Sequence, residues 1–370
     1  MVGLQDCKDL YKGHRRLNQR TEPRHRIFYK SLPKVELHRH LEGSLRLSTM
    51  LEIARQHDLD LPYRDIDAFR SLVQVRDGEP FTHQNFLSKF NTLRLFYQSP
   101  EVIKRVVREA IADAATDNIR YMELRFTPVA LTRMKGYPLD EAMDWVIETA
   151  RDSSERYGVQ TRLIASVNRH ESVDLAEQVL KHSIDRKDKG IIALDLAGGE
   201  ADFPGDTFIG VFKEAREAGL RITIHAGEWG GPENVRLAIE KLGAERIGHG
   251  IRTMEDGGVV AMSRERGIVF EVCPTSNYQS GVVTTLIHNP LMGMINANLI
   301  VTINTDDPSI SQIDLGDEYE LACESLGLSV ADLLKTIVQS ARAAFLPQGE
   351  HDALVASLEK EFTAMNAAGS

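Results

Sequence analysis

The stretch RITIHAGEWGGPENVRLAIEKLGAERIGHG, residues 221–250, contains one complete unit of the fold that we expect for this chain. Its ends, RITIHAG (221–227) and RIGHG (246–250), are short apolar runs typical of parallel strands covered on both faces. The residues between them have a helical pattern, and Gly243 stands where a left-handed C-terminal cap would end the helix. The stretch therefore predicts a strand, a crossover helix and a second parallel strand.

Six further runs of the same kind occur along the chain, with helical patterns between them. They are VELHRH (35–40), YMELRFTP (121–128), TRLIASVN (161–168), IIALDLAG (191–198), IVFEVCP (268–274) and LIVTINTDDP (299–308). Eight alternations of strand and helix favour a closed (β/α)8 TIM barrel over an open doubly wound sheet, which usually has fewer strands. A doubly wound sheet also often has a glycine-rich phosphate turn, and no GxGxxG or GxxxxGKS motif follows the first run.

The 370 residues suffice for a single barrel domain with additional helices, so the whole chain is expected to be one domain. Residues 41–118 are too long for an ordinary connection, which predicts extra helices packed over the barrel mouth. Within them, residues 83–96 place Phe86, Leu87 and Phe90 on one helical face. This face fits packing against the barrel and a substrate lid equally well.

Both ends of the chain extend beyond the barrel pattern. After Asp307 we expect at least two more helices, one of them beginning at Ser329. Residues 1–30 form an N-terminal extension, and we interpret the basic stretch from Lys12 to Arg26 as a solvated or docked tail.

Composition excludes several classes of partner. The chain has 44 basic and 54 acidic residues, a net charge of −10, which argues against nucleic acid and anionic membrane surfaces. No apolar run approaches the roughly 20 residues that cross a bilayer. The negative charge therefore fits a small-molecule ligand better. The three cysteines form no CxxC pair and no disulfide framework, so we expect a cytoplasmic protein. The sequence predicts no particular oligomeric state.

Polar side chains end several of the predicted strands, where active sites of this fold form. His38 and His40 lie two apart on one strand and therefore point to the same side. His225 and His249 end the fifth and sixth strands, and Asp306 ends the eighth. Imidazole and carboxylate ligands together suit Zn²⁺, although Fe²⁺ or Mn²⁺ could occupy such a site. No lysine ends the fourth strand to help bridge a second ion, so we expect one metal per chain.

The motifs, taken in order, resemble the signatures of the adenosine deaminase family within the amidohydrolase superfamily. They are PKVELHRHLEGS (33–44), MELRFTP (122–128), DLAGGE (195–200), HAGE (225–228), RIGHG (246–250), EVCPTSN (271–277) and NTDDPSI (304–310). The resemblance extends from about Leu32 to Phe345, which is most of the chain.

The resemblance implies zinc on His38, His40, His225 and Asp306, with a water molecule as the remaining ligand. Zinc lowers the pKa of such a water towards roughly 7, so that hydroxide forms at neutral pH. His249 is then implied to orient this water and to help deprotonate it.

The remaining roles concern the purine itself. Glu228 is implied to protonate the ring nitrogen beside the attacked carbon, and Asp307 to hydrogen-bond a nitrogen of the imidazole ring. The Gly198 amide is implied to reach the pyrimidine ring from its other edge. His40, Phe86 and Phe90 are expected to complete the substrate contacts.

The expected activity is hydrolytic deamination of adenosine and 2′-deoxyadenosine to inosine products and ammonia. Glu42 departs from the family pattern, because most members have an aspartate there that contacts the ribose. The alternative is therefore deamination of another 6-aminopurine, such as adenine, aminodeoxyfutalosine or a modified adenosine. His170, just after the third strand, is a further candidate group near the site. A non-catalytic purine-binding protein is a third hypothesis, which the complete set of acid, base and ligand residues argues against.

Overall fold

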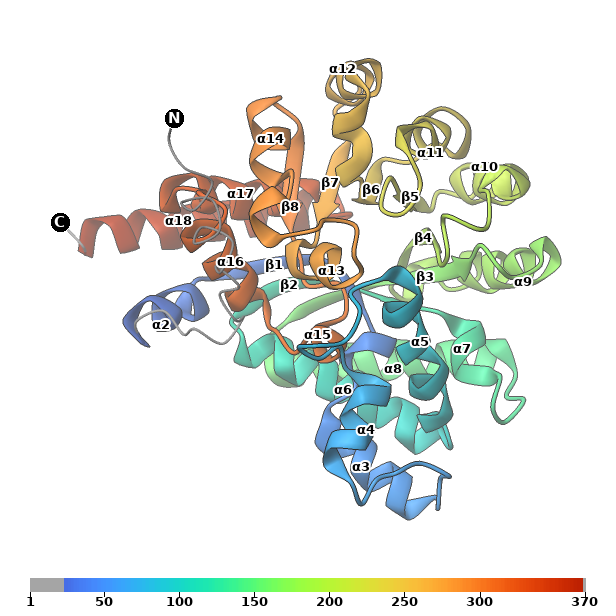
Figure 1. Cartoon of the computed structure of the whole chain (residues 1–370). Helices are drawn as coiled ribbons and strands as arrows, with labels where there is room; N and C mark the ends of the chain where they lie inside the picture. The colour runs from blue at the N-terminus through green and yellow to red at the C-terminus, as the bar shows by residue number, and fades with distance from the viewer. Residues whose placement is uncertain (1–22, 369–370) are drawn as a thin grey trace, which may run out of the picture.

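The computed structural model describes residues 23–368, which contain an eight-stranded parallel sheet rolled into a barrel and surrounded by helices (Figure 1). The strand order in the sheet follows the chain from β1 to β8. The barrel closes between the first and the last strand. There Arg39 of β1 forms an isolated β-bridge with Asp306, which follows β8, and the His40 amide donates to the Asp306 carbonyl at 2.8 Å. The predicted barrel is confirmed.

The eight strands are β1 (Lys34–His40), β2 (Ile119–Phe126), β3 (Gln160–Asn168), β4 (Ile191–Ala197), β5 (Arg221–Ala226), β6 (Arg246–His249), β7 (Val269–Val272) and β8 (Ile300–Ile303). The larger helices are α2 (Pro23–Ser31), α3 (Leu47–Gln56), α4 (Ile66–Val73), α5 (His83–Leu93), α6 (Pro100–Thr116), α8 (Leu139–Tyr157), α9 (Val173–Ile184), α10 (Ile209–Glu217), α12 (Gly257–Glu265), α16 (Leu315–Glu324), α17 (Val330–Ala343) and α18 (Gln348–Ala368). Shorter helices are α7 (Pro128–Thr132), α11 (Pro232–Leu237), α13 (Pro274–Gln279), α14 (Leu291–Asn296) and α15 (Pro308–Ser311).

Local sequence explains where the helices begin and end. The Ser99 side chain accepts a hydrogen bond from the Val102 amide and so caps α6, whose first residue is Pro100. Gly158 and Gly243 end their helices in the left-handed conformation, with φ of 71° and 75°. The helix end at Gly243 agrees with the expectation from the sequence.

The connection between β1 and β2 contains α3, α4, α5 and α6, which Figure 1 shows gathered on one side of the barrel. The predicted helix at 83–96 ends earlier: α5 stops at Leu93 and a short 3₁₀ turn, η3 (Arg94–Phe96), follows. Phe86 is only 2% exposed and packs in the core, whereas Phe90 is partly buried. The packing interpretation of this face has direct support, and the lid remains a prediction.

The two ends of the described chain pack on the barrel side that lies away from α5 (Figure 1). Helix α17 begins after its cap Ser329, as predicted, and buries Leu333 and Ile337. Helix α2 packs against α16, where Arg26 pairs with Asp317 at 2.9 Å. This basic residue is docked, whereas most of the basic N-terminal stretch lies outside the described residues. No helix within residues 23–368 is both long and apolar enough to cross a membrane.

Candidate active site

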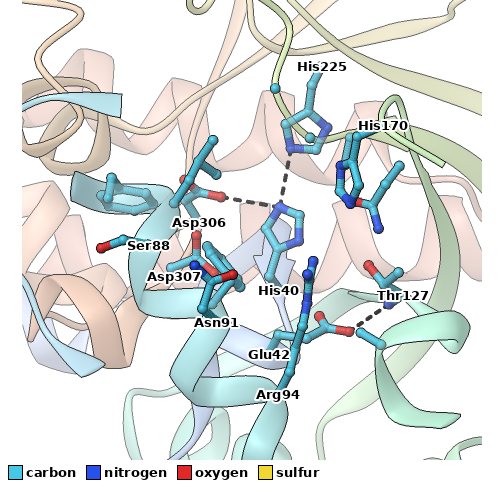
Figure 2. Close-up of a pocket in the computed structure, with 18 of the residues that line it drawn as sticks. His40, Glu42, Ser88, Asn91, Arg94, Thr127, His170, His225, Asp306 and Asp307 are labelled. Atoms are coloured by element: carbon cyan, nitrogen blue, oxygen red, sulfur yellow. Dashed lines mark hydrogen bonds and ion pairs between the residues drawn. The ribbon is translucent and has the colours of Figure 1, made fainter. Parts of the chain in front are cut away.

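A cavity of about 480 Å³ opens at the C-terminal ends of the strands. Its volume is within the range of pockets that enclose small-molecule ligands. Figure 2 shows His40, His225, Asp306 and Asp307 meeting in this cavity from β1, β5 and the turn after β8. The lining includes every residue predicted to contact substrate: His40, Glu42, Phe86, Phe90, Gly198 and Asp307.

Four side chains converge on one point beside this cavity. Ligand atoms of His38, His40, His225 and Asp306 all lie within 4.8 Å of one another, and all four residues are buried. The Nε2 atoms of His40 and His225 are 3.2 Å apart. Asp306 Oδ1 lies 3.2 Å from Nε2 of His38 and 3.3 Å from Nε2 of His40. The four predicted ligands therefore form one cluster of the size that a single metal ion requires.

Carboxylates behind two of these imidazoles fix their orientation. Glu271 Oε2 lies 2.7 Å from His38 Nδ1, and Asp195 Oδ1 lies 2.9 Å from His225 Nδ1. An Nδ1–H that donates to a carboxylate leaves the Nε2 lone pair free for an ion. Consistent with this, the buried Nε2 of His38 has no hydrogen-bond partner. Three imidazole nitrogens and one carboxylate oxygen are a donor set that fits zinc.

Glu271 is itself held inside the barrel by two arginines. Arg125 donates to its Oε2 at 2.7 Å and Arg246 donates to its Oε1 at 2.6 Å. Burial alone would raise the pKa of Glu271, but the charges of Arg125 and Arg246 hold that pKa well below its usual range. The carboxylate is therefore ionised and can orient His38.

Backbone conformation turns two consecutive aspartates into the site. The eighth strand ends at Ile303, and Asp306 has a φ of 64°, in the left-handed region that non-glycine residues rarely adopt. This turn allows both Asp306 and Asp307 to line the cavity, which a regular strand would prevent. Gly43 is required opposite, because a Cβ there would lie 1.8 Å from Asp307 Oδ1.

The predicted acid and base lie side by side. Glu228 Oε2 is 3.6 Å from His249 Nε2, and both residues are almost completely buried. Burial raises the pKa of Glu228 well above its usual value, and the neighbouring charges of Asp306 and Glu200 raise it further. His249 is held on its other side, where the Asn277 amide nitrogen lies 3.1 Å from Nδ1. The surroundings of Glu228 thus favour the protonated form of its carboxyl group.

Comparison with known proteins shows the family of the chain. The sequence model described as adenosine deaminase matches residues 33–361. The chain belongs to the adenosine deaminase family. It is 39% identical over 327 residues to an adenosine deaminase of Erwinia tasmaniensis, and this match covers 88% of the chain and 98% of the relative.

Solved structures extend the likeness to the whole fold. An amidohydrolase of Burkholderia ambifaria with bound zinc has a TM-score of 0.85 and 27% identity, covering 95% of this chain and 96% of its own. The adenine deaminase of Arthrobacter aurescens has a TM-score of 0.83 and 30% identity, covering 90% and 100%. This member of the adenosine deaminase family is therefore an enzyme of the amidohydrolase class.

One residue of the family motif DLAGGE has a position that the sequence did not reveal. Glu200 is buried, and its two oxygens accept hydrogen bonds from the amides of residues 227 to 230, at 2.7 to 3.0 Å. Its Oε1 also accepts from Asn234 Nδ2 at 3.0 Å. One carboxylate thus holds the turn that carries Glu228.

Glu42 and Gly198 both line the cavity. Glu42 Oε1 accepts a hydrogen bond from the Thr127 amide at 2.7 Å, while its buried Oε2 has no partner. Gly198 has a φ of 90°, a conformation that a side chain would strain. His170, the further candidate from the sequence, lines the same cavity.

Proposed function

We propose that the chain hydrolyses the 6-amino group of adenosine and 2′-deoxyadenosine, releasing ammonia and the inosine products. The observation that carries this proposal is the position of Glu228. Its buried carboxyl group lies in the same cavity as ligands of the four-residue cluster and 3.6 Å from His249, in surroundings that raise its pKa. An acid, a base and a metal site that face one small-molecule cavity are the set that hydrolytic deamination needs.

We infer one zinc ion per chain, held by His38, His40, His225 and Asp306. When bound, zinc makes hydroxide available at neutral pH as the nucleophile. The unpartnered Nε2 of His38 and the carboxylates behind His38 and His225 support this ligand set.

Glu228 supplies the proton that makes the purine ring electrophilic. A protonated carboxyl group donates to the ring nitrogen beside the attacked carbon, so negative charge does not accumulate on the ring. Because Glu228 is almost completely buried, water does not compete for this hydrogen bond.

His249 and Asp307 position the other reacting groups. His249 Nε2 faces both Glu228 and Asp306, at 3.6 and 4.0 Å, so it can hold a proton taken from the attacking water. That role needs a free Nε2 lone pair. The Asn277 amide nitrogen lies 3.1 Å from Nδ1 and the amide oxygen has no partner, so the side-chain amide must turn to let its oxygen accept from Nδ1–H. Asp307 Oδ1 is buried without a partner and is available to a nitrogen of the purine.

Glu42 favours a second candidate, deamination of another 6-aminopurine such as adenine or aminodeoxyfutalosine. The glutamate reaches one methylene further into the cavity than the aspartate expected at this position, and its Oε2 is unpartnered. The likeness to the Arthrobacter aurescens adenine deaminase supports including adenine among the candidates.

Comparing the candidate substrates on zinc-loaded protein tests the proposal. Ammonia release is measured in parallel with adenosine, 2′-deoxyadenosine, adenine and aminodeoxyfutalosine. We expect the two adenosines to have the highest kcat/KM. Much faster turnover of adenine or aminodeoxyfutalosine would replace the first candidate with the second. Tight nucleoside binding without turnover of any aminopurine would support the non-catalytic hypothesis instead.

A further inference from the structure

Asn168 is a polar residue of the cavity lining to which the proposed reaction gives no role. It ends β3 and is only 6% exposed, yet it lines the cavity. Its Nδ2 atom is buried without a hydrogen-bond partner, and no group within residues 23–368 donates a hydrogen bond to its Oδ1. Polar groups of buried side chains are normally paired, so the Asn168 amide is available to a ligand.

The fold does not need the Asn168 side chain. Asn168 pairs with Ala197 of β4, and the Arg169 amide donates to the Ala197 carbonyl at 2.8 Å. The turn after β3 is closed by the Glu171 amide, which donates to the Asn168 carbonyl at 3.0 Å. These are backbone contacts, which do not depend on the side chain at position 168. An apolar residue of the same size could therefore end the strand and keep the turn.

The oxygen of the Asn168 side chain lies beside Gly198. A Cβ on Gly198 would lie 3.5 Å from Asn168 Oδ1 and 3.3 Å from His170 Nδ1. Burial raises the pKa of Glu171, whereas the charge of Arg133 and the Asn168 amide lower it, which places the NH₂ end of this amide on the Glu171 side. Oδ1 is thus the end of the side chain that a ligand beside Gly198 would meet.

The strand order places Asn168 between the two groups that are expected to hold the two halves of a nucleoside. Gly198 follows β4, Thr127 follows β2, and Asn168 ends β3 between them. Figure 2 shows Glu42 beside Thr127, where its Oε1 accepts from the Thr127 amide at 2.7 Å. Asn168 therefore lies between the expected contact to the base, at Gly198, and the expected contact to the sugar, at Glu42.

We propose that Asn168 binds the 2′-hydroxyl group of the nucleoside and makes the enzyme prefer ribose to 2′-deoxyribose. This inference rests on the proposed function, with one pyrimidine nitrogen directed to Glu228 and the other, N3, to the Gly198 amide. When the base is in the anti orientation, N3 and the sugar C2′ lie on the same side of the glycosidic bond. A hydroxyl group there can donate to Asn168 Oδ1. One neutral hydrogen bond has a modest net value, so both adenosines remain substrates.

The experiment compares adenosine with 2′-deoxyadenosine and 3′-deoxyadenosine on zinc-loaded full-length protein. We expect kcat/KM for adenosine to exceed that for 2′-deoxyadenosine by about three- to tenfold, the value of one neutral hydrogen bond. Asn168→Leu keeps the approximate size of the side chain and removes both polar atoms, so this ratio should fall to about one. The ratio of adenosine to 3′-deoxyadenosine should keep its native value. Asn296→Leu replaces an exposed asparagine at the end of α14 and is the matched control, with both ratios unchanged.

Three results would overturn the proposal. The first is an equal kcat/KM for adenosine and 2′-deoxyadenosine in the unmodified protein. The second is an equal loss for all three nucleosides in Asn168→Leu, which would show a structural role. The third is a change confined to the 3′-deoxyadenosine ratio, which would assign Asn168 to another hydroxyl group. If Asn168→Leu does not fold, Asn168→Ala takes its place with the same expected ratios.

Calorimetric binding of inosine and 2′-deoxyinosine provides a readout that does not depend on turnover. Tighter binding of inosine, lost in Asn168→Leu, supports the 2′-hydroxyl contact even if no nucleoside is deaminated, in which case the proposed function fails by itself. Deamination of both adenosines together with equal binding of the two inosines overturns the contact and leaves the proposed function intact.

Discussion

Replacing Glu200 with glutamine tests whether one carboxylate holds the acid Glu228 in place. Glu200 accepts five hydrogen bonds, two at Oε1 and three at Oε2. Glutamine keeps one of these two oxygens as an acceptor. In place of the other it has an NH₂ group, which cannot accept hydrogen bonds from the N–H groups that now donate to that oxygen. At least two hydrogen bonds to a charged acceptor are lost, each contributing about 1.5–3 kcal/mol, so the turn is destabilised by about 3–6 kcal/mol before it relaxes.

A turn that relaxes by about 1 Å moves Glu228 away from the purine nitrogen, and such a displacement costs about a hundredfold in turnover. We therefore expect kcat of Glu200→Gln to fall by about that factor while KM changes much less and zinc content stays at the native value. Steady-state kinetics, elemental analysis and a thermal melt are measured together. Glu233→Gln removes an exposed carboxylate nearby and is the matched control.

Three results would refute this reasoning. A kcat within about threefold of the native value would mean that the turn keeps Glu228 in place without the five hydrogen bonds that Glu200 accepts. A loss of kcat that follows the loss of zinc, or equal changes in kcat and KM, would show a general structural defect rather than displacement of the acid.

Three further predictions concern single side chains. Glu228→Gln should retain zinc but lose at least about a hundredfold in turnover, and a near-native rate would exclude it as the general acid. Asp306→Ala should lose metal affinity, so full zinc content by elemental analysis would contradict its role as a ligand. Burial raises the pKa of Glu318 to about 8, although its hydrogen bond from the Thr275 amide opposes this. The folded state therefore favours the protonated form of Glu318, whereas the unfolded chain loses this proton at lower pH. Between about pH 5 and pH 8, the free energy of unfolding of the unmodified protein should fall with rising pH by up to about 1.4 kcal/mol per pH unit, relative to that of Glu318→Gln. Urea unfolding of both proteins at several pH values measures this difference, and parallel curves would contradict it.

The fold was predictable because its signals are local and repeated. Each apolar run is a strand covered on both faces, and glycines such as Gly158 and Gly243 end helices where the left-handed conformation is needed. The candidate site residues could be predicted in the same way, because the C-terminal ends of the parallel strands all lie at one end of the barrel. The last predicted run was longer than the strand, since Asp306 and Asp307 lie in a turn whose backbone conformation no periodicity indicates.

The supporting carboxylates were missed because their partners are distant in the sequence. Glu271 lies in the apolar run IVFEVCP, and it contacts His38 more than 200 residues earlier. A charged residue in a strand covered on both faces must be paired, and this rule could have singled out Glu271 and Asp195. Glu200 gave no such signal, because a glutamate in a loop is ordinarily a surface residue.

The arginine pair around Glu271 has a consequence for how the enzyme acquires its metal. Zinc fingers fold only around their ion, because no site exists in the unfolded chain. Here Arg125, Arg246 and Glu271 anchor His38 through contacts made by the barrel itself. We therefore expect the polypeptide to complete its folding before metallation, and an ion to be lost and regained without unfolding. Metal supply around the finished protein, rather than during its synthesis, would then determine which fraction of the enzyme is active.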